Sequence, residues 1–182
     1  MAKLVSKTYA DALFSLSLEK DKVDKLNEEV MVLQSVLKEN KELLDVLQHP
    51  HIDKNEKLQL VENIFKDRLD SDLMGFLMTI VDKERQAEIF NILDYYISLV
   101  KEYKHIGVAY VTTAVELSDA RKQEILEKLI NTTDYESFEM NYIVDASVIG
   151  GCVIKINDRV IDSSISSRLG KLSEELMSAA VQ

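Results

Sequence analysis

Apolar residues recur at helical spacing through residues 1–104. In the clearest example, every third or fourth position is apolar, which places all five residues on one side of a helix: Val23, Leu26, Val30, Leu33 and Leu37. The same spacing predicts helices at about residues 5–19, 23–38, 43–47, 53–65, 73–81 and 84–104. The connections between these helices are short, so the pattern predicts a six-helix bundle.

Polar residues mark where these helices begin and end. Pro50 cannot continue a helix and closes the third one. Asp53 precedes the fourth helix in a pattern that resembles a capping box, with Glu56 three positions later. Asp70 or Ser71 is in the position of a cap for the fifth.

The pattern changes after residue 104. Residues 106–115 are rich in β-branched and aromatic side chains, which favour a strand. A helix follows after Ser118, and residues 138–145 then alternate so that Phe138, Met140, Tyr142 and Val144 share one face of a strand. We therefore predict an α+β fold, with a helical bundle at 1–105 and a small domain at 106–182 that holds a short mixed sheet and a C-terminal helix.

The stretch at residues 143–165 predicts a hairpin followed by a helix. Gly150-Gly151 gives the backbone freedom just before the first strand, and Asn157-Asp158 has the chemistry of a tight turn. Ser163 and Ser164 can cap the last helix. The apolar positions of that helix are Ile165, Leu169, Leu172 and Leu176.

Composition limits the classes of function. The chain has 182 residues and a net charge of −10, which disfavours binding to nucleic acid or to anionic lipid. Cys152 is the single cysteine, so an intrachain disulfide is excluded, and we expect it to be a small core residue. The amino terminus lacks a signal-peptide pattern, and no run approaches the roughly 20 apolar residues of a membrane span. We expect membrane association only through partners.

Candidate catalytic and metal-binding residues are sparse. His49 and His51 flank Pro50 without further ligands at metal spacing, so we interpret them as a solvated turn. Gly150-Gly151 precedes a strand, whereas a phosphate cradle precedes a helix. The carboxylates Asp145, Asp158 and Asp162 lie at strand ends and turns, where Asp serves local backbone hydrogen bonds. We predict no catalytic residue, no cofactor and no metal.

Two helices are apolar over an unusually wide arc. The first carries Val5, Tyr9, Ala10, Ala12, Leu13, Phe14 and Leu16, and the fifth carries Leu73, Met74, Phe76, Leu77, Met78, Ile80 and Val81. Each set covers roughly 200°, whereas a helix that buries one side needs about 100°. Either both helices are covered all round at the centre of the bundle, or one sector of each lines a groove for a partner helix.

Three motifs resemble the delta subunit (OSCP) family of rotary ATP synthases. Two of them are Tyr9-Ala10-Asp11-Ala12-Leu13-Phe14 and Thr113-Ala114-Val115-Glu116-Leu117-Ser118. The third and most specific comprises Val144-Asp145, Val148, Gly150-Gly151, Ile154, Asn157-Asp158 and Val160-Ile161-Asp162-Ser163-Ser164. One departure is Asp82-Lys83-Glu84-Arg85, where many relatives carry an Asn-Gly-Arg-like turn.

The resemblance implies a non-catalytic peripheral-stalk (stator) subunit of a proton-translocating ATP synthase. Its helical domain would hold the N-terminal helix of an alpha subunit of the catalytic head, between the first and fifth helices. Carried over by helix position, the groove residues are Tyr9, Ala12, Leu13, Leu16, Phe76, Leu77 and Ile80.

The second domain would bind the C-terminal helices of the membrane-anchored b subunits, through the exposed face of its last helix and the turn at Asn157-Asp158-Arg159. The implied location is the cytoplasmic face of a bacterial membrane, where the protein would be peripheral. Two other classes stay open from the residues alone: a freestanding helix-binding adaptor or chaperone, and a small-molecule-binding regulator built on the α+β part.

Overall fold

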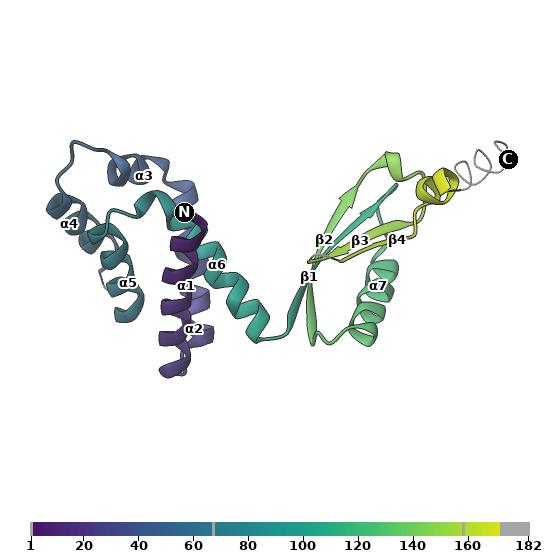
Figure 1. Ribbon diagram of the computed structural model, residues 1–182, viewed down its shortest axis with the longest axis horizontal. Coiled ribbons are helices and arrows are strands. Elements are labelled where there is room, and N and C mark those ends of the chain that lie inside the picture. The colour runs from purple at the N-terminus through teal and green to yellow at the C-terminus, as the bar shows by residue number, and fades with distance from the viewer. Residues whose placement is uncertain (1, 67, 158, 172–182) are drawn as a thin grey trace. The chain divides into compact units, whose positions relative to one another are not determined.

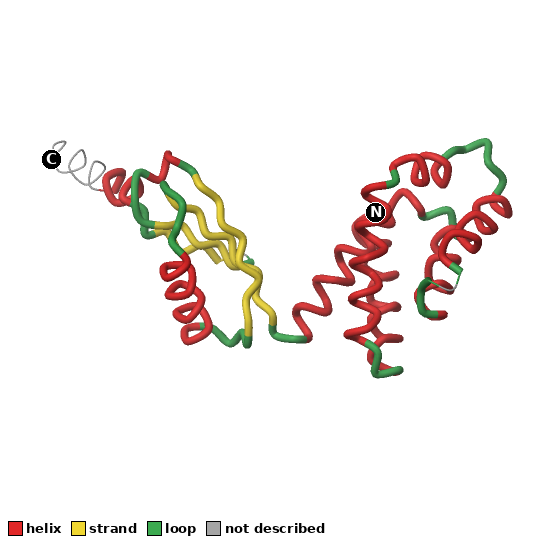
Figure 2. Tube along the Cα trace, turned by 180° about the vertical axis from the view of Figure 1, so that it is seen from behind, coloured by secondary structure: helices red, strands yellow, loops and turns green. Residues whose placement is uncertain are grey.

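The computed structural model describes residues 2–66, 68–157 and 159–171, and the chain divides into two compact units, Met1–Val100 and Lys101–Gln182. Figure 2 shows that the described strands all belong to the second unit, while the first is built from helices and loops. This arrangement confirms the predicted α+β fold.

The predicted helices of the first unit are all present (Figure 1). They are α1 (Ala2–Glu19), α2 (Val23–Glu39), α3 (Lys41–Gln48), α4 (Lys54–Phe65), α5 (Ser71–Asp82) and α6 (Ile89–Tyr103), with a short 3-10 helix η1 (Gln86–Glu88) before the last. The buried residues of α2 are the predicted seam, from Val23 to Leu37. Asp53 and Asp70 cap α4 and α5, and each accepts a hydrogen bond from the backbone N–H two residues later.

The start of the sixth helix differs from the prediction. α5 ends in a Schellman motif, in which Arg85 N donates to Ile80 O at 2.9 Å and Glu84 N donates to Val81 O at 3.0 Å. Glu84 takes a positive φ of 55° at this C′ position. The left-handed residue turns the chain, so Glu84 and Arg85 connect two helices, and α6 begins at Ile89 after η1.

The second unit has one sheet whose strand order is β2-β1-β3-β4 within the described residues. The strands are β1 (Ile106–Thr113), β2 (Ser137–Val144), β3 (Cys152–Ile156) and β4 (Arg159–Asp162), and the helices between them are α7 (Asp119–Thr132) and η2 (Ala146–Val148). β1 pairs in parallel with β2 and antiparallel with β3, and β3 forms the predicted hairpin with β4.

α7 covers one face of this sheet, as Figure 1 shows. Leu129 of α7 packs in a small core with Ala109 and Ile156, and Phe138 and Met140 join them from β2. The predicted apolar face of β2 is therefore covered only along its first half. Val144, at the far end of that strand, is 59% exposed.

Candidate functional site

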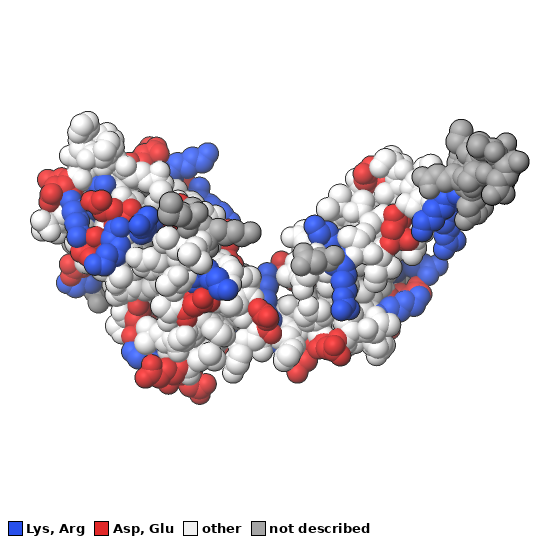
Figure 3. All heavy atoms as spheres, in the orientation of Figure 1, with Lys and Arg blue, Asp and Glu red and all other residues white. Residues whose placement is uncertain are grey.

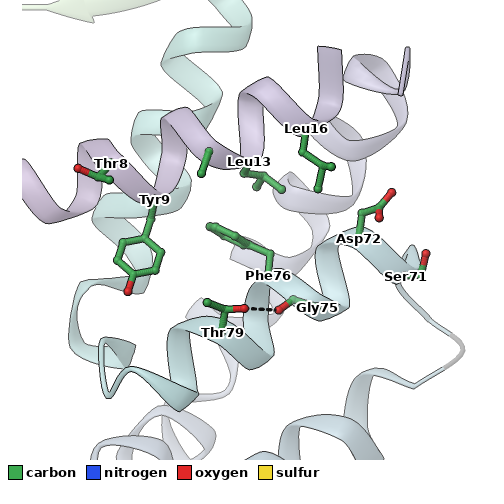
Figure 4. Close-up of a pocket in the computed structure, with 10 residues that line it drawn as sticks. Thr8, Tyr9, Leu13, Leu16, Ser71, Asp72, Gly75, Phe76 and Thr79 are labelled. Atoms are coloured by element: carbon green, nitrogen blue, oxygen red, sulfur yellow. Dashed lines mark hydrogen bonds between the residues drawn. The ribbon is translucent and has the colours of Figure 1, made fainter. Parts of the chain in front are cut away.

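An apolar groove runs between α1 and α5 in the first unit. It encloses about 490 Å³, and Figure 4 shows side chains from both helices turned toward it. Its lining residues are Thr8, Tyr9, Ala12, Leu13, Leu16, Ser71, Asp72, Gly75, Phe76 and Thr79.

The wide apolar arc of α1 serves two surfaces. Ala10, Leu13 and Ser17 are buried and face the core of the first unit. Tyr9, Ala12 and Leu16 lie beside that seam, line the groove and remain at least partly exposed. Leu13 belongs to both surfaces, since it is buried and also lines the groove. A single helix thus completes the core and leaves a second apolar stripe open.

α5 divides its faces in the same way. Leu73, Leu77, Ile80 and Val81 are buried in the core. The opposite side presents its groove-lining residues, of which Phe76 is the large apolar one and the others are small or polar: Ser71, Asp72, Gly75 and Thr79. The Thr79 hydroxyl donates to Gly75 O at 2.8 Å, so it is satisfied within its own helix (Figure 4).

An aromatic pair spans the groove. The rings of Tyr9 and Phe76 lie edge to face, with centroids 6.5 Å apart and an angle of 64° between the planes. Because each ring comes from a different helix, the pair fixes how far the two walls stand apart at this point. The groove therefore has an aromatic side chain on each of its two walls.

Charged residues anchor α5 beside one end of the groove. Asp70 accepts from Lys25 Nζ at 2.7 Å and from Lys22 Nζ at 3.1 Å, and its own backbone N donates to Glu29 Oε2 at 2.7 Å. The Lys25 ammonium, the Asp72 backbone N–H and Lys22 together hold the pKa of Asp70 well below its ordinary value. The next carboxylate, Asp72, lines the groove and forms an ion pair with Lys20 at 2.5 Å.

Five of the seven groove residues predicted from the sequence line this groove: Tyr9, Ala12, Leu13, Leu16 and Phe76. Leu77 and Ile80 do not, because they point into the core and are 2% and 0% exposed. The prediction did not include Thr8, Ser71, Asp72, Gly75 and Thr79. The available signal was the spacing of Ser71, Gly75 and Thr79, which puts three small residues on one side of α5, one turn apart.

The other candidate chemistry is local and structural. His49 Nδ1 accepts from the backbone N of His51 at 3.3 Å within the turn. Asp145 accepts from Ser147 N at 2.9 Å, Asp162 accepts from Ser164 N at 2.8 Å, and Asp158 lies outside the described residues. Cys152 is half-buried on β3, not in the small core as expected.

The described ranges hold neither a metal-binding cluster nor a membrane-spanning helix. Residues 2–66, 68–157 and 159–171 bring together no cluster of three or more metal-ligating side chains. In the same part of the chain, no helix has the length and apolar character needed to cross a membrane. Figure 3 shows acidic and basic side chains interspersed on the face that it draws.

The second unit exposes apolar residues on and beside the predicted stalk contact. The helix at 165–171, part of that prediction, carries Ile165 and Leu169, which are 45% and 54% exposed. β4 begins at Arg159 of the predicted turn, and its later residue Ile161, which was not part of the prediction, is 50% exposed. Ser164 caps the helix that begins at Ile165, since its Oγ accepts from Ser167 N at 3.2 Å. The continuation through Leu172 and Leu176 lies outside the described residues.

The sheet face away from α7 is also open. It forms a shallow cavity of about 420 Å³ lined by Tyr110, Thr112, Ile143, Val153, Lys155 and Val160. Two of the three described strand pairings are antiparallel, and a sheet of antiparallel pairs can leave one face open to solvent. The second unit therefore presents apolar surface on its strands as well as on its last described helix.

Comparison with known proteins identifies the family. A family model described as ATP synthase delta (OSCP) subunit matches residues 5–176. The chain is 53% identical over 176 residues to ATP synthase subunit delta of Lachnoclostridium phytofermentans and 36% identical over 178 residues to that of Alkaliphilus oremlandii, with 97% of each chain covered in both cases.

A solved structure has the same fold. A chain of the Toxoplasma gondii mitochondrial ATP synthase hexamer aligns with a TM-score of 0.73 at 18% identity, covering 94% of this chain and 97% of that one. The family model and the relatives match nearly the whole chain, including the motifs near both ends. The chain therefore belongs to the ATP synthase delta (OSCP) subunit family.

Proposed function

We propose that this protein, as a peripheral-stalk (stator) subunit of a proton-translocating rotary ATP synthase, grips the N-terminal helix of an alpha subunit in the α1–α5 groove. The observation that carries the proposal is that α1 and α5 each complete the core with one face, while an apolar groove stays open between their second faces. Its partly exposed apolar residues are Tyr9, Ala12, Leu16 and Phe76. Apolar surface that the fold does not use is typical of a docking site.

An amphipathic helix is the occupant that suits this groove. Its apolar stripe would pack between the two walls, with Tyr9 and Phe76 as anchors. Burying one large apolar side chain contributes about 1.5–3 kcal/mol, and nanomolar affinity corresponds to about −12 kcal/mol. A handful of well-packed anchors can therefore dominate a tight contact, although association also costs translational and side-chain freedom.

The second unit supplies the other end of the connection in this proposal. Its exposed apolar residues on β4 and on the helix at 165–171 would bind the C-terminal helices of the membrane-anchored b subunits. The protein would then hold the catalytic head to the membrane stalk on the cytoplasmic face of a bacterial membrane, and torque from the central shaft would drive synthesis instead of spinning the head. This role needs two binding surfaces and no active site of the subunit's own.

Calorimetric titration with a synthetic peptide tests the groove. The peptide is the N-terminal segment of the alpha subunit from the same organism, and the variant is Phe76→Asp, which places a charge on the groove wall. Val32→Asp is the matched control, because Val32 is 60% exposed on α2 and does not line the groove.

We expect submicromolar binding to the wild type and to Val32→Asp, and at least tenfold weaker binding to Phe76→Asp. Equal affinities for all three proteins would refute the groove assignment. Copurification with the other ATP synthase subunits separates the stator role from a freestanding adaptor.

A further inference from the structure

Gly75 lies in the middle of α5, on the side that faces the groove. A Cβ atom built on Gly75 would meet nothing within 4 Å, so the free protein has room for a side chain at this position. Glycine is a poor residue for a helix interior because it loses more backbone entropy than alanine. The free fold therefore gives no packing reason for a glycine here.

The residues one turn before and after Gly75 on the groove side of α5 also have small side chains. Ser71 and Thr79 lie one turn away on the same face, and the Thr79 hydroxyl is turned back onto the Gly75 carbonyl at 2.8 Å. The large side chain of Phe76 lies beside these small residues and extends toward Tyr9. The distance between two packed helices, usually about 8–10 Å, depends on the side chains at their contact, and small residues allow the shorter values.

We infer that Gly75 is the point of closest approach between α5 and the helix bound in the groove, so that the partner fills the space a Cβ atom would take. The inference rests on the proposed function, because the occupant is the alpha-subunit helix. It adds that Gly75 determines which helices fit, since any larger residue would hold the occupant away from the apolar wall formed by Phe76 and Leu13.

Two substitutions at Gly75 and one matched control test the inference. Gly75→Ala and Gly75→Leu add side chains of increasing size, and both residues favour helix more than glycine does. Gly170→Ala is the control, because Gly170 also lies in a helix, at 165–171, and its Cβ would likewise meet nothing within 4 Å. Thermal unfolding and calorimetry with the alpha-subunit peptide are measured on each full-length protein.

We expect Gly75→Ala to raise the unfolding temperature by about 3 °C and yet to bind the peptide at least tenfold more weakly. Gly75→Leu should abolish measurable binding, while Gly170→Ala keeps wild-type affinity. Wild-type affinity in Gly75→Ala, or a lower unfolding temperature in that variant, would overturn the inference. If the wild type itself does not bind the peptide, the proposed function fails and the inference fails with it.

Discussion

Tyr9 of α1 and Phe76 of α5 meet edge to face across the groove, with ring centroids 6.5 Å apart. Both residues are only partly buried, and both pack against the main core of the first unit. The pair therefore links two helices that are distant in sequence, and its rings stay partly exposed in the groove. Because the two rings touch in the free protein, their contribution to the free energy of unfolding can be measured without a partner.

A double-mutant cycle measures that energy. We expect Tyr9→Leu and Phe76→Leu to show a favourable coupling of about 0.5–1.5 kcal/mol in the free energy of unfolding, because aromatic pairs contribute beyond their buried area. Urea denaturation of the wild type, both single variants and the double variant gives the coupling. Strict additivity of the two single effects would show that the ring contact contributes nothing.

Asp70 should make the first unit sensitive to acid. Its native pKa is lowered by Lys25, by the Asp72 N–H and by Lys22, so the unfolded state takes up the proton first as the pH falls. The stabilisation is complete above the ordinary Asp pKa of about 4 and is lost progressively below it. Asp70→Ala should lower the free energy of unfolding by about 1 kcal/mol at neutral pH through loss of the cap alone.

Urea denaturation at about pH 7 and pH 3 checks this expectation. The wild type should lose more stability between the two pH values than Asp70→Ala does, since the variant lacks the titrating group. Parallel losses in the two proteins would show that other carboxylates carry the acid sensitivity.

Glu84 offers a stabilising substitution. It holds a positive φ of 55° at the end of α5, a conformation that costs a non-glycine residue about 1–2 kcal/mol. Glu84→Gly should therefore raise the free energy of unfolding by about 1 kcal/mol, because glycine adopts this conformation readily.

The companion substitution Asp21→Gly should raise the free energy of unfolding by less than Glu84→Gly does. Asp21 has a φ of 52° in the equivalent motif after α1, where Lys22 N donates to Ser17 O at 2.9 Å. Asp tolerates left-handed backbone better than Glu does. Chemical denaturation of both variants shows which one gains more free energy of unfolding. A loss of stability in Glu84→Gly would contradict the strain argument.

The two adjacent glycines before β3 should respond differently to alanine. Gly151 has a φ of 78°, and a Cβ there would lie 2.4 Å from the backbone O of Ser163. A Cβ on Gly150 would meet only the end of the Ile165 side chain, at 2.8 Å. Gly151→Ala should cost the second unit about 2 kcal/mol or more, and Gly150→Ala should cost less than about 1 kcal/mol. Similar unfolding curves for the two variants would contradict this difference.

The helical seams and caps were predictable from the sequence because burial imposes a strict period. The seam of α2 and the caps Asp53 and Asp70 are where the spacing and the polar residues put them. The start of α6 could not be predicted in this way. The left-handed turn before it is formed by Glu84, whereas such a turn is usually marked in a sequence by glycine. Similarly, how far α7 reaches along β2 depends on packing between distant segments, which an alternating pattern does not encode.

The groove was predicted more fully on α1 than on α5, where Phe76 is the one lining residue that the prediction included. On α1, the residue pattern and the family resemblance both pointed to Tyr9, Ala12 and Leu16. On α5, hydrophobicity favoured Leu77 and Ile80, which are the core residues, since a core demands the most apolar positions. The groove face of α5 combines one aromatic residue with small and polar ones, so its sequence resembles an ordinary exposed surface.

Titration of the ¹⁵N-labelled protein with the alpha-subunit N-terminal peptide, followed by amide NMR, tests the central claim most directly. If the α1–α5 groove holds this helix, the largest shift changes will gather at Tyr9, Ala12, Gly75, Phe76 and Thr79, while the amides of α7 and the sheet stay unchanged. Unchanged spectra at saturating peptide, or changes confined to surfaces other than α1 and α5, would contradict it.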